Sequence, residues 1–509
     1  MKLSDLAQTA MLGTERQTLP NVTGSSALVR LLGQLNASER ENSLLAAAAL
    51  CALHEGAGAL PPRDPAAPEA ECAPESQSCI PVSAVALVRR LLEGEYPGLF
   101  PECLVLMTRA QRLIPPELVP QALETGIQRA ELREALFPVL GRRGHWLAAQ
   151  NPAWAWVTSD TLDEGVWQTG SMPARIQLFR QLRHSNPERA VSLLEATWKE
   201  EEPEDRSAFV AEMATGLGSS DEPFLEAALT DKRKEVRRAA ARLLAVFPES
   251  AYTQRMRERV RPLLVFTAGQ AGAALKLKRA KKASLEVTLP AACDPAMQRD
   301  AIEPRPPAGT GEKAWWLIQM LEAVPLKTWT SEWSVTPEEI ITASQASEWK
   351  KDLFEGWTRA AIRQRDSAWA DALFEPALGG DRPTVPAELM AVLSPARREA
   401  RLMALLTADA KKTRELHGAL LAQCRHDWSP EFARIVLAYL RKESAREFYD
   451  WQVRNQLKEW ARYLPSTVFA EAASGWNPEA KAWEFWSKGV DELLAAIQFR
   501  ADLQRTFSL

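Results

Sequence analysis

The stretch DKRKEVRRAAARLLAVFPES, residues 231–250, predicts an amphipathic helix and sets the interpretation of the whole chain. At about 100° per residue, its apolar side chains collect in one stripe. Lys234 and Arg238 point away from that stripe, and Arg242 faces outward more obliquely. The stripe consists of Val236, Ala239, Ala240, Leu243, Leu244 and Phe247. One side of this helix is therefore expected to pack against protein, while the other side carries positive charge.

A repeat of 31 residues runs through the same region. Arg175, Arg206 and Arg237 share this spacing, and apolar residues recur in register with them. The recurring sets are Leu178, Phe209 and Ala240, followed by Leu182, Met213 and Leu244. Apolar positions that recur while polar positions drift are typical of helix pairs stacked on one another. The repeat therefore predicts a helical solenoid.

Four residues of this region resemble the landmark positions of HEAT repeats, which are armadillo-like α-solenoid modules of two antiparallel helices. They are Pro223, Asp231, Val236 and Arg237, and the likeness extends over residues 175–260. The resemblance implies a ladder of hydrogen bonds between adjacent repeats, in which Asp231 and Arg237 are structural ladder residues. It implies nothing specific about function.

The chain as a whole resembles an uncharacterised bacterial family whose members have about this length. The similar segments include MLGTER at 11–16, LGRRGHWLAAQNPAWAW at 140–156 and GEKAWWLIQMLEAVP at 311–325. Members of that family are typically encoded beside MoxR-type AAA+ ATPases and von Willebrand factor A-domain proteins. The resemblance therefore implies an adaptor that works with an AAA+ ATPase or an A-domain protein, and it implies no catalytic residues.

Breaks rich in proline divide the chain into helical sections. The expected organisation is 1–55 N-terminal helices, 56–80 a flexible Pro/Ala-rich loop, 81–262 helical repeats including the HEAT-like unit 221–250, 263–310 a β-hairpin and Pro-rich insertion, and 311–509 Trp-rich C-terminal helical repeats. The hairpin is predicted because Leu275 and Leu277, then Leu285, Val287 and Leu289, alternate with polar residues around a polar turn. The predicted fold class is mainly α, a HEAT-like solenoid with one small β-hairpin.

The composition is typical of a globular protein, with 46% hydrophobic and 25% charged residues and a net charge of −4. A mildly acidic total argues against a dedicated nucleic-acid binder. Six cysteines in 509 residues do not indicate a disulfide framework. The start lacks the pattern of a secretory signal, and the longest apolar run, Leu44–Leu53, is far shorter than the ~20 residues that span a bilayer. These features predict a cytoplasmic protein with reduced thiols and no membrane contact.

Eighteen tryptophans, several in close sets such as Trp315 with Trp316 and Trp329 with Trp333, accompany only five tyrosines. Our main interpretation is that they are core side chains sealing the joints between helices. The alternative is an aromatic platform for bases or for a peptide.

No pattern in the sequence supports catalysis. The histidines are scattered without metal-ligand spacing on one helix. The segment GTGEK at 309–313 lacks the spacing of a phosphate-binding loop, and Ala314 stands where that loop needs a hydroxyl. No G-x-S-x-G motif surrounds a serine. A non-enzymatic role without cofactor or metal is therefore favoured.

The basic residues of the opening stretch are the candidate partner-binding residues. They are Lys232, Arg233, Lys234, Arg238 and Arg242. Positive charge at the start of a helix does not help the helix dipole, so its placement gains nothing for helix stability. Three interpretations stay open: a solvated face, a surface for an acidic protein, or contact with a phosphate backbone.

Two functional hypotheses follow. The first is a non-enzymatic scaffold or adaptor for protein–protein interaction. The alternative is a nucleic-acid-binding or DNA-processing HEAT-like protein that uses the basic region 231–282.

Overall fold

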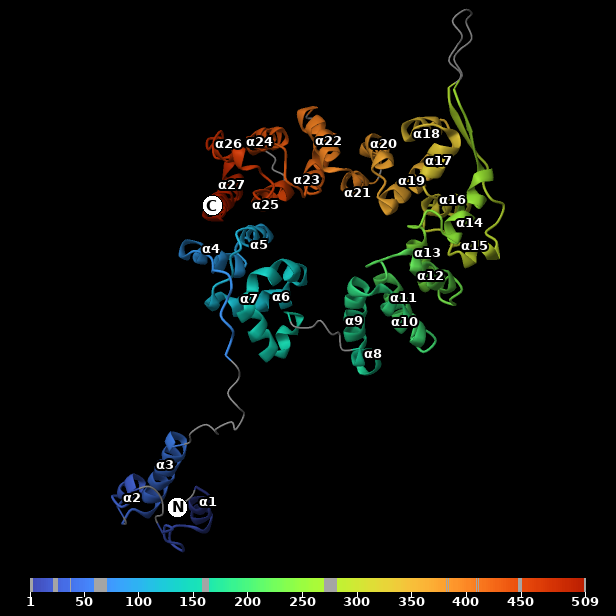
Figure 1. The fold of residues 1–509 in the computed structure, drawn as a ribbon. Coiled ribbons are helices and arrows are strands. Elements are labelled where there is room, and N and C mark those ends of the chain that lie inside the picture. Colours follow the sequence, from blue (N-terminus) through green and yellow to red (C-terminus); the bar gives the residue numbers. More distant parts are fainter. Residues whose placement is uncertain are drawn as a thin grey trace, which may run out of the picture. The chain divides into compact units, whose positions relative to one another are not determined.

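The computed structural model of the chain is mainly α-helical (Figure 1). It describes residues 3–21, 26–36, 38–58, 71–157, 164–269, 282–380, 382, 384–408, 410, 412–446 and 451–507. Within these residues the only sheet is a two-stranded antiparallel hairpin, which confirms the predicted mainly-α class with a small hairpin. The chain divides into two compact units, residues 1–72 and 73–509.

The first unit consists of α1 (Leu3–Leu12), α2 (Ser26–Leu32) and α3 (Arg40–Gly58). Both short helices pack on α3. The shared core is small and consists of Leu6, Leu28, Leu32, Leu44, Ala47 and Cys51. So few buried apolar side chains give this unit a modest hydrophobic stabilisation.

The second unit begins with helices that run in close succession along the chain. Up to residue 260 they are α4 (Val82–Leu92), α5 (Phe100–Arg109), α6 (Val119–Gln128), α7 (Arg133–Gln150), α8 (Gly165–Thr169), α9 (Met172–Ser185), α10 (Pro187–Thr197), α11 (Pro203–Glu212), α12 (Glu222–Ala228), α13 (Lys234–Leu244) and α14 (Ala251–Val260). Short 3-10 helices lie between helices of the unit at Pro116–Leu118, Ala130–Leu132, Pro152–Val157, Ser219–Asp221, Arg261–Leu263, Arg414–Leu416 and Ser466–Val468.

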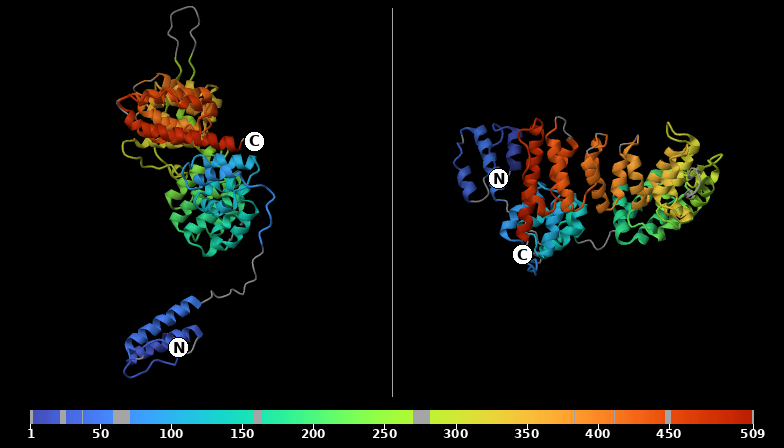
Figure 2. Two further views of the ribbon diagram at one scale, coloured as in Figure 1. Left: turned by 90° about the vertical axis from the view of Figure 1, so that its left-hand side faces the viewer. Right: turned by 90° about the horizontal axis from the view of Figure 1, so that it is seen from above.

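The remaining helices follow the hairpin. They are α15 (Pro295–Arg299), α16 (Glu312–Ala323), α17 (Lys327–Trp333), α18 (Pro337–Ser344), α19 (Lys350–Gln364), α20 (Ser367–Leu378), α21 (Val385–Val392), α22 (Pro395–Ala408), α23 (His417–Leu421), α24 (Pro430–Ser444), α25 (Trp451–Trp460), α26 (Phe469–Ala472) and α27 (Trp483–Phe507). Figure 2 shows helices near the C-terminus standing side by side. One continuous apolar core runs through the unit, and Trp329, Trp357, Trp369 and Trp486 are completely buried in it.

The helices that carry the 31-residue register pack side by side, α9 on α11 and α11 on α13. Arg175 of α9 binds the carboxylate of Glu201, and Arg206 of α11 binds the carboxylate of Asp231 with an Nε–Oδ2 distance of 2.9 Å. Each acidic residue also accepts through its backbone carbonyl: Glu201 from Arg206 and Asp231 from Arg237, both at 2.7 Å. Glu201, which precedes α11, thus contacts both Arg175 of α9 and Arg206 of α11. Asp231, which precedes α13, contacts both Arg206 of α11 and Arg237 of α13.

The hairpin pairs β1 (Leu264–Thr267) with β2 (Ser284–Val287), in the register Leu264↔Val287. The second strand lies where the alternation of Leu285 and Val287 predicts it. The first strand lies earlier than predicted, because residues 264–267 and not Leu275 and Leu277 pair with β2. Residues 270–281, which contain that predicted strand and Lys276, Lys278, Arg279 and Lys281, lie outside the described residues.

Glu75, in the predicted flexible loop 56–80, is hydrogen-bonded to α7 of the second unit. The Glu75 carboxylate accepts the backbone N–H groups of Arg142 and Arg143 at 2.9 and 2.8 Å, beside Gly141, where α7 is kinked. Gly141 has a φ of 64°, and a Cβ there would lie 2.7 Å from the Glu75 carboxylate. The kink therefore exposes N–H groups that Glu75 satisfies.

The last helix of the chain returns to the first helices of the second unit. Helix α27 packs against α4 and α5. Arg500 binds Glu102 with an Nε–Oε2 distance of 2.7 Å, and Phe499 stacks on Tyr96 with ring centroids 4.5 Å apart. Contacts between residues almost 400 positions apart therefore join the two ends of this unit.

Candidate functional site

The structure divides the five predicted partner-binding residues into two groups. Lys232 and Arg233 lie in the turn before α13, are exposed, and have side chains that make no ion pair or hydrogen bond with any described residue. Lys234 begins α13 and lies 3.9 Å from the exposed Glu235 carboxylate. Arg238 and Arg242, one turn apart further along α13, instead line a cavity.

We name this space the arginine cavity. It has a volume of about 500 Å³ and lies among α13, α14, α16, α19 and the segment 301–307. Its charged lining residues are Arg238, Arg242, Arg305, Arg359, Arg363, Glu303 and Glu322. Five guanidinium groups therefore face one space beside only two carboxylates, a surplus of positive charge in a chain that is acidic overall.

Three of the arginines are neutralised within the protein. Arg238 contacts the Glu303 carboxylate, and Arg363 contacts that of Glu322. Arg359 binds Glu355 with an Nε–Oε1 distance of 2.7 Å and lies 3.6 Å from Glu322.

The remaining two arginines of the cavity are exposed. Arg242 and Arg305 make no ion pair or hydrogen bond within the described part of the chain. They supply the unneutralised charge of the arginine cavity.

Arg363 occupies the most enclosed position of the five. Burial lowers the pKa of its guanidinium to about 10; the nearby Tyr252 opposes this decrease, and the like charge of Arg242 adds to it. The guanidinium remains protonated at neutral pH. Glu322 pairs with Arg363, so the charge beside it that has no counter-ion among the described residues is that of Arg242.

The segment that carries Arg305 is held in place at several points. Gln319 of α16 accepts the Glu303 N–H at 2.8 Å and donates to the Glu303 carbonyl at 3.2 Å. The indole N–H of Trp316 donates to the Pro304 carbonyl at 3.1 Å. Further back, the completely buried Asp300 binds two arginines of α14. Arg305, which lies between two prolines, is therefore carried by a constrained backbone.

A second cavity of about 520 Å³ adjoins the first and shares Pro307, Trp315 and Arg359 with it. We name it the Trp315 cavity. Trp315 is half-buried, the Arg359 guanidinium lies 5.3 Å from its ring centroid, and its buried indole N–H has no hydrogen-bond acceptor among the described residues. Phe354 and Ile318 add apolar surface.

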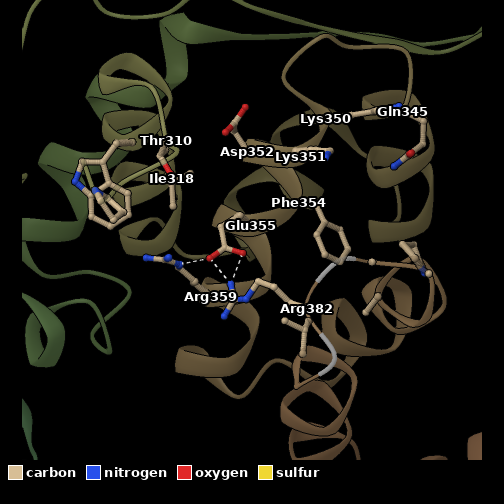
Figure 3. Close-up of a pocket in the computed structure, with 17 residues that line it drawn as sticks. Thr310, Ile318, Gln345, Lys350, Lys351, Asp352, Phe354, Glu355, Arg359 and Arg382 are labelled. Atoms are coloured by element: carbon tan, nitrogen blue, oxygen red, sulfur yellow. Dashed lines mark hydrogen bonds and ion pairs between the residues drawn. The ribbon is translucent and has the colours of Figure 1, made fainter. Parts of the chain in front are cut away.

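Two carboxylates line the Trp315 cavity, and they differ in environment (Figure 3). Arg359 and Arg382 both bind Glu355, with an Arg382 Nη1–Oε1 distance of 2.6 Å. Asp352 makes no ion pair with any described residue, and burial raises the pKa of its carboxyl group. Asp352 is therefore a free hydrogen-bond acceptor in this cavity.

A third and smaller cavity, of about 260 Å³, continues from the arginine cavity along α13. Lys234 and Arg237 line it, and it shares Arg238 and Arg305 with the arginine cavity. The structure therefore brings Lys234, Arg238 and Arg242 to one continuous basic surface and leaves Lys232 and Arg233 on the adjacent turn.

Sequence reasoning missed the other half of this site. Arg359 and Arg363 are spaced four residues apart on α19, as Arg238 and Arg242 are on α13, and that spacing was a visible signal. Nothing in the sequence places the two pairs across one cavity, because they belong to helices far apart in the chain. Apart from its flanking prolines, nothing in the sequence around Arg305 indicates that it lines a cavity.

Within the described residues, no three His, Cys, Asp or Glu side chains gather as metal ligands. None of the described helices combines the length and the apolar character needed to cross a membrane.

The fold and the cavities define a class of protein: a mainly α-helical chain with a cavity lined by arginines between its helices. The chain belongs to the family of unknown function DUF5691, whose family model matches residues 5–507. No curated protein and no solved structure matches it.

Proposed function

We propose that this chain is a non-enzymatic helical-repeat scaffold, HEAT-like in its stacking, that binds an acidic surface of a protein partner at the turn before α13. The observation that carries the proposal is the exposure of Lys232 and Arg233 with no acidic partner in the described residues. Two adjacent unneutralised cations attract an acidic surface, and the attraction weakens as salt rises.

Several other basic residues of the region 231–282 are neutralised by the protein itself, while residues 270–281 lie outside the described part of the chain. Arg255 and Arg259 bind Asp300, and Arg261 binds Glu332 at 2.6 Å. This internal pairing withdraws Arg255, Arg259 and Arg261 from a phosphate backbone, and the net charge of −4 also favours a protein partner over a nucleic acid. Binding of nucleic acid remains the second candidate function and is one outcome of the test below.

The proposed partners are a MoxR-type AAA+ ATPase or a von Willebrand factor A-domain protein, as the family resemblance implies. The test is isothermal titration of the purified chain with each protein at low and at physiological salt. We expect a complex with at least one of them, and we expect K232E/R233E to weaken it about tenfold or more. R242E/R305E, which makes the same change in charge within the arginine cavity, is the matched control and should bind normally.

Failure of both proteins to bind would overturn the partner assignment. Equal weakening by both double variants would show that only the total charge matters, and this would overturn the docking turn. Tight, steeply salt-dependent binding of duplex DNA in the same titration, lost in K232E/R233E, would replace this proposal with the nucleic-acid alternative.

A further inference from the structure

The unneutralised arginines of the arginine cavity suit a ligand with several negative charges. Arg242 reaches the cavity from α13 and Arg305 from the anchored segment 301–307. A guanidinium presents five N–H donors in a planar fork that matches phosphate oxygens in pairs. Arg363, which Glu322 pairs, lines the same cavity, and a bound anion would add to the interactions that favour its charged form.

The neighbouring Trp315 cavity has a different chemistry. It offers the rings of Trp315 and Phe354, and it offers the free acceptor Asp352. Asp352 and Glu355 line this cavity together with Lys350, Lys351, Arg359 and Arg382, and the Asp352 carboxylate can accept a hydrogen bond from a hydroxyl or amino group. The same surroundings would accept a flat heterocycle and a sugar.

The two cavities meet at Trp315 and Arg359, so one molecule can occupy both. Their volumes, about 500 and about 520 Å³, each lie within the range of roughly 300–1,000 Å³ usual for small-molecule sites. A ligand that suits both cavities has a polyanionic end and, beside it, an aromatic end with hydrogen-bond donors.

We propose that the arginine cavity and the Trp315 cavity together bind a nucleoside polyphosphate. Arg242 and Arg305 bind the phosphates, the base lies against Trp315, and the Asp352 carboxylate accepts a hydrogen bond from the sugar or the base. Arg359, at the border of the two cavities, faces the phosphate nearest the sugar. This site is separate from the docking turn of Lys232 and Arg233, from which Arg242 is about 14 Å away along the helix axis.

The test is isothermal titration of the full chain, without added metal, with three probes: ATP, inorganic tripolyphosphate and adenosine. We expect ATP to bind about tenfold or more tightly than tripolyphosphate, and adenosine to bind weakest, because only ATP fills both cavities. R242E/R305E should lose about 100-fold or more in ATP affinity. W315A should lower ATP affinity to the level of tripolyphosphate and leave tripolyphosphate binding unchanged.

K232E/R233E is the matched control, and its ATP affinity should equal that of the unaltered chain. An equal loss in both double variants would show diffuse attraction of anions and would overturn the site. Equal affinities for ATP and tripolyphosphate would overturn the nucleoside half, and no binding of any probe would overturn the whole proposal. Urea unfolding of each variant verifies that a loss of binding is not a loss of folding, and R242Q/R305Q replaces any double variant that unfolds.

Discussion

Arg183 is completely buried, and its guanidinium is surrounded by acceptors from the segment 213–221. It binds both carboxylate oxygens of Asp221, at 2.9 and 2.7 Å, and donates to the backbone carbonyls of Met213, Thr215 and Gly216. Without the guanidinium, the Met213 carbonyl and the carboxylate of the buried Asp221 would lose their arginine donors, and Asp221 would keep only the Gly218 N–H among the described residues. A buried charge is tolerable only with such complete pairing.

We therefore expect Arg183→Ala to lower the free energy of unfolding of the second unit by about 3–5 kcal/mol, because Asp221 stays buried without its counter-ion. Arg180→Ala, three residues earlier, removes a half-exposed pair with Glu212 and should lower it by less than about 1 kcal/mol. Urea unfolding followed by circular dichroism measures both. Equal losses in the two variants would contradict the role assigned to Arg183.

At the scale of elements, the contacts among α9, α11 and α13 include acidic residues bound by arginines. Burial alone would raise the pKa of Glu201, but hydrogen bonds from Arg175 and Thr197 and the charges of Arg175 and Arg206 bring it below its ordinary value of 4.5. Since the folded pKa is the lower one, the stabilisation is fully present above pH 4.5 and is lost as the pH falls through the folded pKa.

Glu201→Gln should consequently be less stable than the unaltered chain at pH 7, and the difference should shrink as the pH falls below 4.5. Urea unfolding at a series of pH values between 7 and 3 measures it. Glu249→Gln, at an exposed position without an ion pair in the described residues, is the control and should show no such convergence. A difference that stays constant with pH would contradict the assignment.

Helices α16 and α19 approach closely because Gly356 has no side chain. A Cβ at this position would lie 2.7 Å from the Cβ of Leu321, an atom that cannot rotate away. The close approach brings Arg359 and Arg363 of α19 to Trp315 and Glu322 of α16, and so it shapes both cavities.

For Gly356→Ala we expect a loss of about 1–3 kcal/mol in the free energy of unfolding, since overpacking outweighs the gain of about 1 kcal/mol in helix propensity. Gly379→Ala, where a Cβ meets nothing within 4 Å, should change it by less than about 0.5 kcal/mol. Thermal and urea unfolding distinguish them. A stabilised Gly356→Ala variant would show that the two helices separate without cost.

The sequence predicted individual helices, and the structure adds how those helices pack on one another. Periodicity predicted the helix 231–250 and the repeat of Arg175, Arg206 and Arg237, because a helix's buried stripe is a local property of its sequence. The position of α13 and α19 around one cavity depends on how elements distant in the chain pack together. A local sequence pattern cannot predict that packing. The first strand of the hairpin was missed because residues 264–267 read Leu-Val-Phe-Thr, without the alternation of apolar and polar residues that marked the segment with Leu275 and Leu277.

At the scale of the whole molecule, the second unit is held together by contacts between its first and last helices as well as by contacts between neighbouring helices. In an open array each repeat contacts only its neighbours. Here Arg500 of α27 binds Glu102 of α5 and donates to the carbonyl of Ala461 at 3.0 Å and to that of Leu464 at 2.5 Å. A substitution in the last helix should therefore lower the stability of the first helices of the unit.

Arg500→Ala removes the donor for all three acceptors and should increase hydrogen exchange in residues 82–109 of α4 and α5, hundreds of positions away in the sequence. Exchange in α9 to α13 should change much less, because those helices hold their own ladder contacts. Arg505→Ala, which removes an exposed pair with Asp502 on the same helix, is the control and should leave α4 and α5 protected. Unchanged hydrogen exchange at residues 82–109 in Arg500→Ala would show that α4 and α5 are stable without this contact. Increased exchange confined to those helices would show that the ends of the unit stabilise one another, as the Arg500–Glu102 pair and the stacking of Phe499 on Tyr96 require.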